Sequence, residues 1–221
     1  MDRKRLVLLS CGALAALVMA ATAIAQVSQA LRPGPAETTL QPSRLDAAFL
    51  AQARQSPMTA RLRAVLADDA NFSRILVQAQ ASSVPVLAPP EPDLLRTARF
   101  YPGDRQYTLV VRRPGIIIEI LGSTLALQAP GAVPFARPVE RQVLTRGQRE
   151  TPLSASIARA ETLGLSNVRT ERTEYGIDVS FVRFGAVYGV SFVCDDLTTL
   201  ECSDAAAVQF AGRLELIGGG Q

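Results

Sequence analysis

The chain has no histidine and no tryptophan, and its one lysine is Lys4. Without an imidazole, Ser-His-Asp and Cys-His catalysis have no general base, and catalytic zinc sites lose their usual ligand. Schiff-base and Ser-Lys chemistry are excluded from the body of the chain because it has no lysine beyond position 4. The sequence also has neither a phosphate-binding loop nor the glycine fingerprint of dinucleotide-binding folds. We therefore predict no catalytic, cofactor-binding or metal site.

The segment 1–25 has the layout of a secretory signal. A basic head at positions 3–5 precedes an uncharged, mostly apolar run, and Ala23-Ile24-Ala25 places small side chains where a signal peptidase cuts. We expect cleavage near Ala25 and a periplasmic or secreted body. The alternative is an uncleaved inner-membrane anchor that holds the body outside the cytoplasm.

Removing this signal changes the charge balance. The segment 1–25 contains three basic residues and one acidic residue, so the formal net charge falls from +3 to +1. No basic patch large enough for nucleic acid remains. The expected partner is an envelope protein or peptide, with membrane contact only through an uncleaved N-terminal segment.

Proline, glycine and helix-start signals divide the rest of the chain. Residues 26–42 are predicted to be a disordered lead and residues 43–81 a helical segment. Residues 82–92, SSVPVLAPPEP, are predicted to be a proline-rich linker. Residues 93–217 are predicted to form an α+β domain. The apolar stripes of the helical segment either pack on this domain or form an arm for a partner.

The α+β domain is predicted to contain antiparallel β-hairpins or meanders packed with helices. A β meander is expected at 93–128, including a strand at 123–128, and a loop at 129–151. Residues 152–217 are expected to form a helix, three strands and a helix. The last helix is predicted at 204–217 from an apolar stripe that includes Phe210, Leu214 and Ile217.

The turn at Pro114-Gly115 predicts the register of one hairpin. It places Arg112 opposite Ile117 and Val110 opposite Glu119. Glu119, in IIIEIL, is then explained by a diagonal cross-strand ion pair with Arg112, or else by a buried catalytic carboxylate. We favour the ion pair. Five residues share the predicted core face: Tyr107, Leu109, Val111, Ile118 and Ile120.

A second hairpin is predicted around Phe184-Gly185. Its register makes four facing pairs on one largely apolar face: Phe181 with Tyr188, Val179 with Val190, Ile177 with Phe192, and Tyr175 with Cys194. The preceding segment, 168–174, alternates but is mostly polar, which is typical of an exposed edge strand. It is a candidate for β-strand addition by a partner.

Cys194 and Cys202 are predicted to form a disulfide, because an exported protein with two nearby cysteines usually joins them. Two cysteines without histidine supply only half of a zinc site, and Cys-x₇-Cys lacks the spacing of a redox pair. Calcium binding by Asp195, Asp196, Glu201 and Asp204 matches no known loop spacing. The bond would fix the start of the last helix beside the apolar sheet face.

The stretch GAVYGVSFVC at 185–194, Cys202-Ser203 and VQFA at 208–211 resemble the end of YbjN-type domains, which are regarded as sensory-transduction regulators of bacteria. The resemblance covers residues 152–212. The helix followed by strands also resembles PepSY-like exported modules. Both resemblances imply an α+β fold with a non-catalytic, protein-binding role.

The predicted function is that of an exported, non-catalytic protein- or peptide-binding or sensory module of the bacterial envelope. One alternative is a membrane-tethered structural envelope factor whose helices at 43–81 form an interaction arm. The other is a small carboxylate-dependent hydrolase that uses Glu119, Asp178 or the Asp195-Asp196 pair.

Overall fold

The computed structural model describes residues 39–128 and 151–221. The predicted signal at 1–25, the predicted lead up to residue 38 and the expected loop at 129–150 lie outside these ranges. The described residues are of mixed α+β class, as predicted. None of the helices within them is long and apolar enough to span a bilayer.

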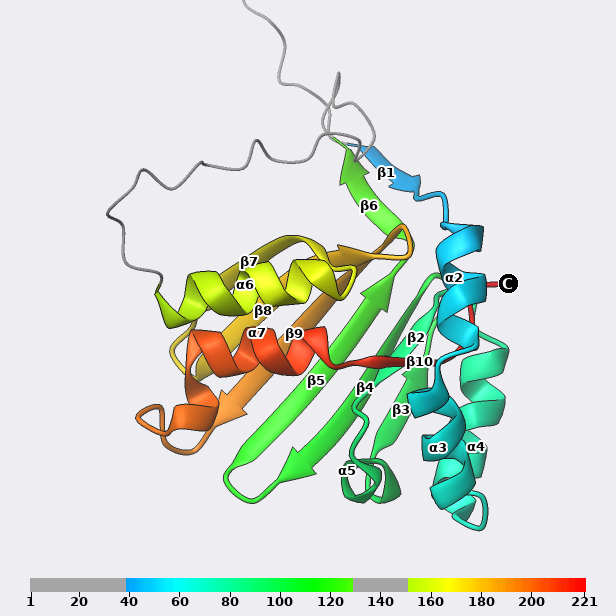
Figure 1. Ribbon diagram of the computed structural model, residues 1–221, viewed down its shortest axis with the longest axis horizontal. Coiled ribbons are helices and arrows are strands. Elements are labelled where there is room, and N and C mark those ends of the chain that lie inside the picture. Colours follow the sequence, from blue (N-terminus) through cyan, green and yellow to red (C-terminus); the bar gives the residue numbers. More distant parts are fainter. Residues whose placement is uncertain (1–38, 129–150) are drawn as a thin grey trace, which may run out of the picture. The chain divides into compact units, whose positions relative to one another are not determined.

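A six-stranded antiparallel sheet forms the framework (Figure 1). Its strands, in spatial order, are β3 (Arg99–Pro102), β4 (Gln106–Arg113), β5 (Ile116–Ser123), β9 (Ala186–Cys194), β8 (Gly176–Arg183) and β7 (Ser166–Arg172). The sheet therefore consists of two three-stranded meanders, β3-β4-β5 and β7-β8-β9, joined through β5 and β9.

The two meanders repeat one pattern at a constant offset in residue number. β4 begins at Gln106 and β8 at Gly176, and the pair Arg99–Val110 corresponds to the pair Arg169–Ser180. At the junction Ile120 pairs with Val190, its own counterpart in the second meander. An approximate two-fold axis thus passes through the centre of the sheet. Among the described residues, the repeated pattern is seen in the strands.

Both predicted hairpin registers are confirmed. Val110 pairs with Glu119 around the first turn, and Phe181 pairs with Tyr188 around the second. Every residue of the first predicted core face is buried, as are the second-hairpin partners up to Phe192 and Cys194. The exception is Tyr175, which is 65% exposed although its carbonyl accepts the N–H of Cys194 at 2.9 Å.

The turn of the second hairpin places a phenylalanine in the left-handed region. Phe184 has φ 55° and Gly185 has φ 78°, the pattern of a primed hairpin turn that usually selects asparagine and glycine. Phe184 is 2% exposed, and its ring lies 4.7 Å from the ring of Phe49. Its carbonyl accepts the N–H of Asp46 at 3.0 Å. Packing therefore stabilises a backbone conformation that local preference disfavours.

The helices cover the apolar face of the sheet. They are α2 (Ala47–Arg54), α3 (Pro57–Val65), α4 (Ala70–Gln80), α5 (Pro92–Arg96), α6 (Pro152–Thr162) and α7 (Asp204–Gly212), with a 3₁₀ turn, η1 (Leu200–Cys202). Helix α7 contacts β7, β8 and β9, and α6 contacts β7 and α7, whereas α5 contacts β4 (Figure 1). Asp46, Asp69, Thr151 and Ser203 cap four of these helices with their side chains.

Two sequence predictions are wrong, and they concern two segments that pair with each other in the structure. Residues 82–92 do not form a linker, because Val86–Ala88 form strand β2, which is fully buried. The last helix ends at Gly212 rather than 217, and Glu215–Gly218 form strand β10, which pairs antiparallel with β2. Helices α2, α3 and α4 all contact β10. The helical segment therefore packs on the domain, and residues 40–128 and 151–221 belong to one unit.

Two buried tyrosines attach the β2 segment to the sheet. Tyr107 of the first meander accepts the N–H of Leu87 at 2.8 Å, and Tyr188 of the second donates to the carbonyl of Pro85 at 2.9 Å. Burial raises the pKa of both hydroxyls above that of free tyrosine. Both groups therefore keep their protons, and the buried backbone of this proline-rich segment gains partners.

The ends of the described ranges also differ from expectation. Thr39–Pro42, the last part of the predicted disordered lead, form β1, which pairs with β6 (Leu125–Gln128) in a separate two-stranded sheet. The strand expected at 123–128 is thus outside the meander. The third strand of that meander is β3, since the Pro102-Gly103 turn joins it to β4.

Candidate functional site

The edge strand β7 is the first element of the candidate site. It is the terminal strand of the described sheet, and five of its seven residues are exposed. Asn167 has φ 54°, and the register with β8 shifts between Ser166 and Arg169. Such a β-bulge interrupts pairing at its own position and leaves Arg169–Arg172 as the regular part of the edge.

The backbone of β7 presents free groups at alternate residues. Thr173 donates its N–H to the carbonyl of Gly176 at 3.0 Å, and these two residues lie opposite each other in the continued β7–β8 register. In an antiparallel ladder such hydrogen-bonded pairs alternate with pairs whose backbone groups point away. The groups of Arg169 and Glu171 therefore point toward β8, whereas those of Thr170 and Arg172 point outward.

The opposite edge of the sheet is closed. On β3, Gly103 donates its N–H to the carbonyl of Gln106 at 2.8 Å, so the outward positions are Phe100 and Pro102. Proline has no N–H to donate, and Phe100 is 9% exposed. Helix α4 contacts β3, and its Asn71 donates to the carbonyl of Ala98 at 3.0 Å. A short strand with proline and a covering helix is a protected edge.

Charged side chains alternate with the outward backbone groups of β7. Arg169 and Glu171 lie opposite Ser180 and Asp178 of β8 and are exposed. Glu171 and Asp178 are thus two like charges in a directly opposed pair, which is unfavourable. No ion pair between described residues engages Arg169 or Glu171. Such ion pairs join Arg96 to Asp69 and Asp93, Arg113 and Arg213 to Glu91, and Arg172 to Asp204.

The face of the sheet that carries these charges is called the polar face. A hollow of about 650 Å³ lies on the polar face, beside the β7 edge. A row of paired residues crosses it: Glu119 lies opposite Ser191, Ser191 opposite Asp178, and Asp178 opposite Glu171. No atom lies within 4 Å of the place where a side chain at Gly189 would begin. The missing side chain deepens the hollow.

The hollow brings together two of the carboxylates singled out in the sequence. Glu119 and Asp178 flank Ser191, whose hydroxyl donates a hydrogen bond to Asp178. Glu119 is exposed, so the buried catalytic carboxylate is not formed. The expected ion pair with Arg112 is not formed either, although the predicted diagonal register is correct: the ion pairs found among described residues do not join these two side chains. The carboxylates of the site can accept hydrogen bonds from a ligand, and that of Glu119 is exposed to solvent.

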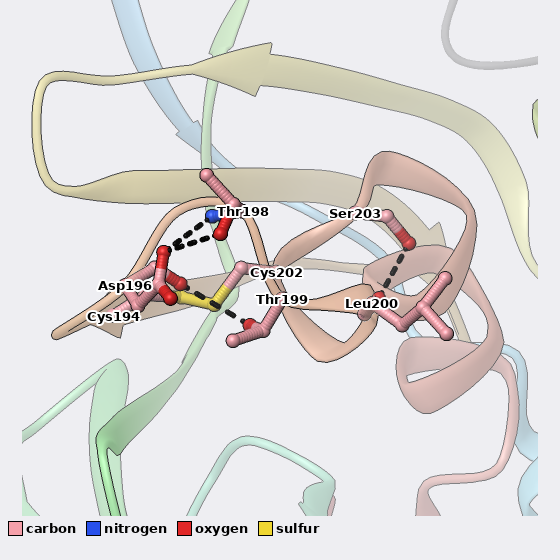
Figure 2. The surroundings of a disulfide bond; sticks show 7 residues. All are labelled: Cys194, Asp196, Thr198, Thr199, Leu200, Cys202 and Ser203. Carbon is pink, nitrogen blue, oxygen red and sulfur yellow. Dashed lines mark hydrogen bonds between the residues drawn. A yellow bond between two sulfur atoms is a disulfide. The ribbon is translucent and has the colours of Figure 1, made fainter.

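The predicted disulfide is present. Cys194 ends β9, Cys202 lies in η1, and their Cα atoms are 6.5 Å apart (Figure 2). Between them Asp196 accepts the N–H and the hydroxyl of Thr198 at 2.8 and 2.7 Å. These two bonds lower the pKa of the Asp196 carboxyl.

The proposed calcium ligands do not converge. Within residues 39–128 and 151–221, no group of three or more acidic, cysteine or histidine side chains is arranged to hold a metal ion. Asp204 instead binds Arg172 at 3.1 Å. The acidic loop is therefore explained by local hydrogen bonds and by the ion pair that anchors β7 to α7.

A second hollow, of about 720 Å³, lies on the apolar side between α3, α6, α7 and β5. Its floor includes Ile118 and Phe192, which are nearly buried. Three arginines line it. Arg113 and Arg213 lie 3.8 and 3.5 Å from Glu91, whereas Arg159 is in none of the ion pairs found among the described residues.

Sequence reasoning identified β7 as an edge but missed the row across the polar face. The row follows from the β5–β9 pairing, which joins segments distant in the chain and carries no local signal. Comparison with family models, with curated proteins and with solved structures found no match to this chain.

Proposed function

We propose that the chain is an exported, non-catalytic protein- or peptide-binding module of the bacterial envelope, which binds its partner by β-strand addition at β7. The observation that supports this most directly is the outward-pointing backbone of Thr170 and Arg172 on a terminal strand. An extended partner segment gains main-chain hydrogen bonds at such an edge, and side-chain contacts give selectivity.

The difference between the two edges supports the same proposal. An unprotected edge is a hazard for aggregation, and natural sheets usually protect it. In this sheet β3 contains Pro102 and contacts α4. Strand β7 has a bulge at its start, exposed charged side chains and contacts with α6 and α7, but it has no proline, so Thr170 and Arg172 keep their outward N–H groups. An edge kept accessible beside a charged hollow is expected to have a partner.

The envelope location is part of the proposal and rests on the signal layout of residues 1–25 and on the disulfide, which persists in oxidising compartments. Cell fractionation combined with mass determination of the mature N-terminus tests it. Cleavage near Ala25 supports a soluble exported protein, whereas an intact N-terminus in the membrane fraction supports the tethered alternative.

Binding at β7 is tested with photo-crosslinking residues placed singly at Arg169 and, as a matched control, at Tyr101 of β3. Both side chains are exposed on edge strands. In intact cells we expect crosslinked partners from position 169 and far fewer from position 101. Equal labelling at both positions would contradict strand addition at β7.

A proline variant sharpens this test. In Thr170→Pro the lost N–H is one that points outward, so the β7–β8 ladder keeps its bonds while the edge loses a donor. We expect crosslinking from position 169 to fall several-fold, with an unchanged circular dichroism spectrum. Unchanged crosslinking in a folded Thr170→Pro variant would show that backbone pairing does not hold the partner.

The hydrolase alternative is not favoured by the geometry. A carboxylate acid or base gains its function from a site that excludes water, and Glu119 is exposed. Glu119→Gln and Asp178→Asn are accordingly expected to affect partner binding rather than a chemical reaction.

A further inference from the structure

The regular part of β7 is complementary to itself. We propose that the partner strand at β7 is β7 of a second copy of this chain, antiparallel to the first, about a two-fold axis through Thr170. This inference rests on the proposed strand addition and names its partner. The two sheets would join into one twelve-stranded antiparallel sheet.

The backbone fits this arrangement. The groups of Thr170 point outward in each copy, so the two threonines face each other and exchange N–H···O=C bonds. Arg172 would then lie opposite Val168 of the second copy, which is in the bulge, so the regular pairing in each copy spans Arg169–Glu171. The threonine side chains are adjacent on the helix-bearing side, and Thr–Thr is a favourable cross-strand pair.

Charge selects this axis over its neighbours. With the axis at Thr170, Arg169 of each copy lies opposite Glu171 of the other, which makes two cross-strand ion pairs. An axis moved to Arg169 would oppose two arginines, and an axis moved to Glu171 would oppose two glutamates. In addition, the backbone groups of these two residues already point toward β8. Side-chain charge and backbone direction therefore agree on one register.

The pairing also corrects an unfavourable contact within each chain. Glu171 lies opposite Asp178 on its β8 side, where two negative charges repel. Arg169 of the second copy would approach Glu171 from the open side and offset this repulsion. The like-charged pair is therefore understandable if β7 is an interface and unexplained if it always faces water.

The assembly would stop at two copies. An isologous contact uses one surface twice and closes on itself. The remaining edges of the twelve-stranded sheet would both be β3, and these lack the N–H of Pro102 and are covered by α4.

The test is the mass of the protein in solution, measured by sedimentation and native mass spectrometry over a range of concentrations. Arg169→Glu places two glutamates opposite each other at both ion-pair sites, and Glu171→Arg does the same with arginines. Each variant is expected to weaken dimerisation by roughly 10- to 100-fold. Arg99→Glu, at the exposed counterpart position on β3, is the control and should leave dimerisation unchanged.

Two combinations make the test specific to the register. An equimolar mixture of Arg169→Glu and Glu171→Arg chains brings opposite charges together at both sites, so it should form heterodimers although neither variant dimerises well alone. The double variant Arg169→Glu/Glu171→Arg restores complementary pairs within one sequence and should dimerise like the natural chain. The folding of each single variant is checked by circular dichroism.

The outcomes separate this inference from the proposed function. A natural chain that stays monomeric while position 169 crosslinks to other proteins overturns self-pairing and leaves strand addition standing. A dimer that is insensitive to both charge reversals and to Thr170→Pro uses another surface, which also overturns self-pairing. Failure of every crosslink at position 169, together with a monomer, removes both proposals.

Discussion

The two meanders of the sheet have the same strand order and the same spacing, yet their outer edges differ. The outward positions of β3 are Phe100 and Pro102, and their counterparts in β7 are Thr170 and Arg172. In β3, Phe100 is buried and Pro102 has no N–H to donate. In β7, Thr170 and Arg172 both keep backbone N–H and C=O groups that point outward. Similar strand arrangements thus end in one edge that lacks an outward N–H and in another edge that keeps its outward N–H groups.

The largest expected contrast concerns the two hairpin turns. Phe184 is 2% exposed and packs on Phe49, whereas its counterpart Pro114 is exposed. Phe184→Ala should lower the free energy of unfolding by about 3 kcal/mol, and Pro114→Ala by less than about 1 kcal/mol. Urea denaturation of the two variants measures both values. Equal losses of unfolding free energy in the two variants would contradict the larger stabilising role of the Phe184 turn.

The disulfide belongs to the second meander alone, since the counterpart of Cys194 is Thr124. Replacing both cysteines by serine should cost about 2.5 kcal/mol through the loss of a short covalent loop. Thermal denaturation of the variant and the natural protein gives the difference. Two thiols that react with a labelling reagent in the unreduced exported protein would contradict the bond itself.

Two glycines at different places in the duplicated sheet should respond with opposite sign. A side chain at Gly122 would overlap the buried ring of Tyr107, whereas the space above Gly189 is empty. Gly122→Ala is expected to cost about 1–3 kcal/mol, and Gly189→Ala to stabilise by about 0.5 kcal/mol because alanine suits a strand better. Urea denaturation of the two glycine variants measures both changes in stability. A loss at Gly189 would indicate that the hollow is narrower than described.

The smallest contrast concerns the end of the open edge. The side chain of Arg172, the counterpart of Pro102, is 60% exposed and pairs with Asp204 at 3.1 Å. Arg172→Ala should lower stability by less than about 1 kcal/mol, and the effect should shrink at high salt. Melting curves at two salt concentrations test this. A large, salt-independent loss would assign Arg172 a structural role beyond this exposed pair.

The parts that the sequence alone predicts are those fixed by local chemistry. Both hairpin registers follow from a two-residue turn combined with alternating side chains, since a slip of one position would reverse both faces. The start of the last helix at residue 204 and the edge character of β7 follow in the same way. The disulfide follows from compartment and spacing.

The parts that sequence reasoning misses depend on partners distant in the chain. A short apolar run between prolines resembles a linker, and Leu214 and Ile217 fit a helical stripe as well as a strand. Only the pairing of β2 with β10, two segments far apart in the chain, gives both segments their structure. The row on the polar face depends likewise on the β5–β9 junction.

The two tyrosine contacts with the β2 segment have a consequence for the order of folding. Each hairpin joins residues close in sequence and can form early, whereas Tyr188 bonds Pro85 across 103 residues. The segment finds both hydroxyl partners only after the two meanders have come together. We therefore expect β2 to dock late, after the two meanders have come together, and pulsed hydrogen exchange at Leu87 during refolding would detect this order.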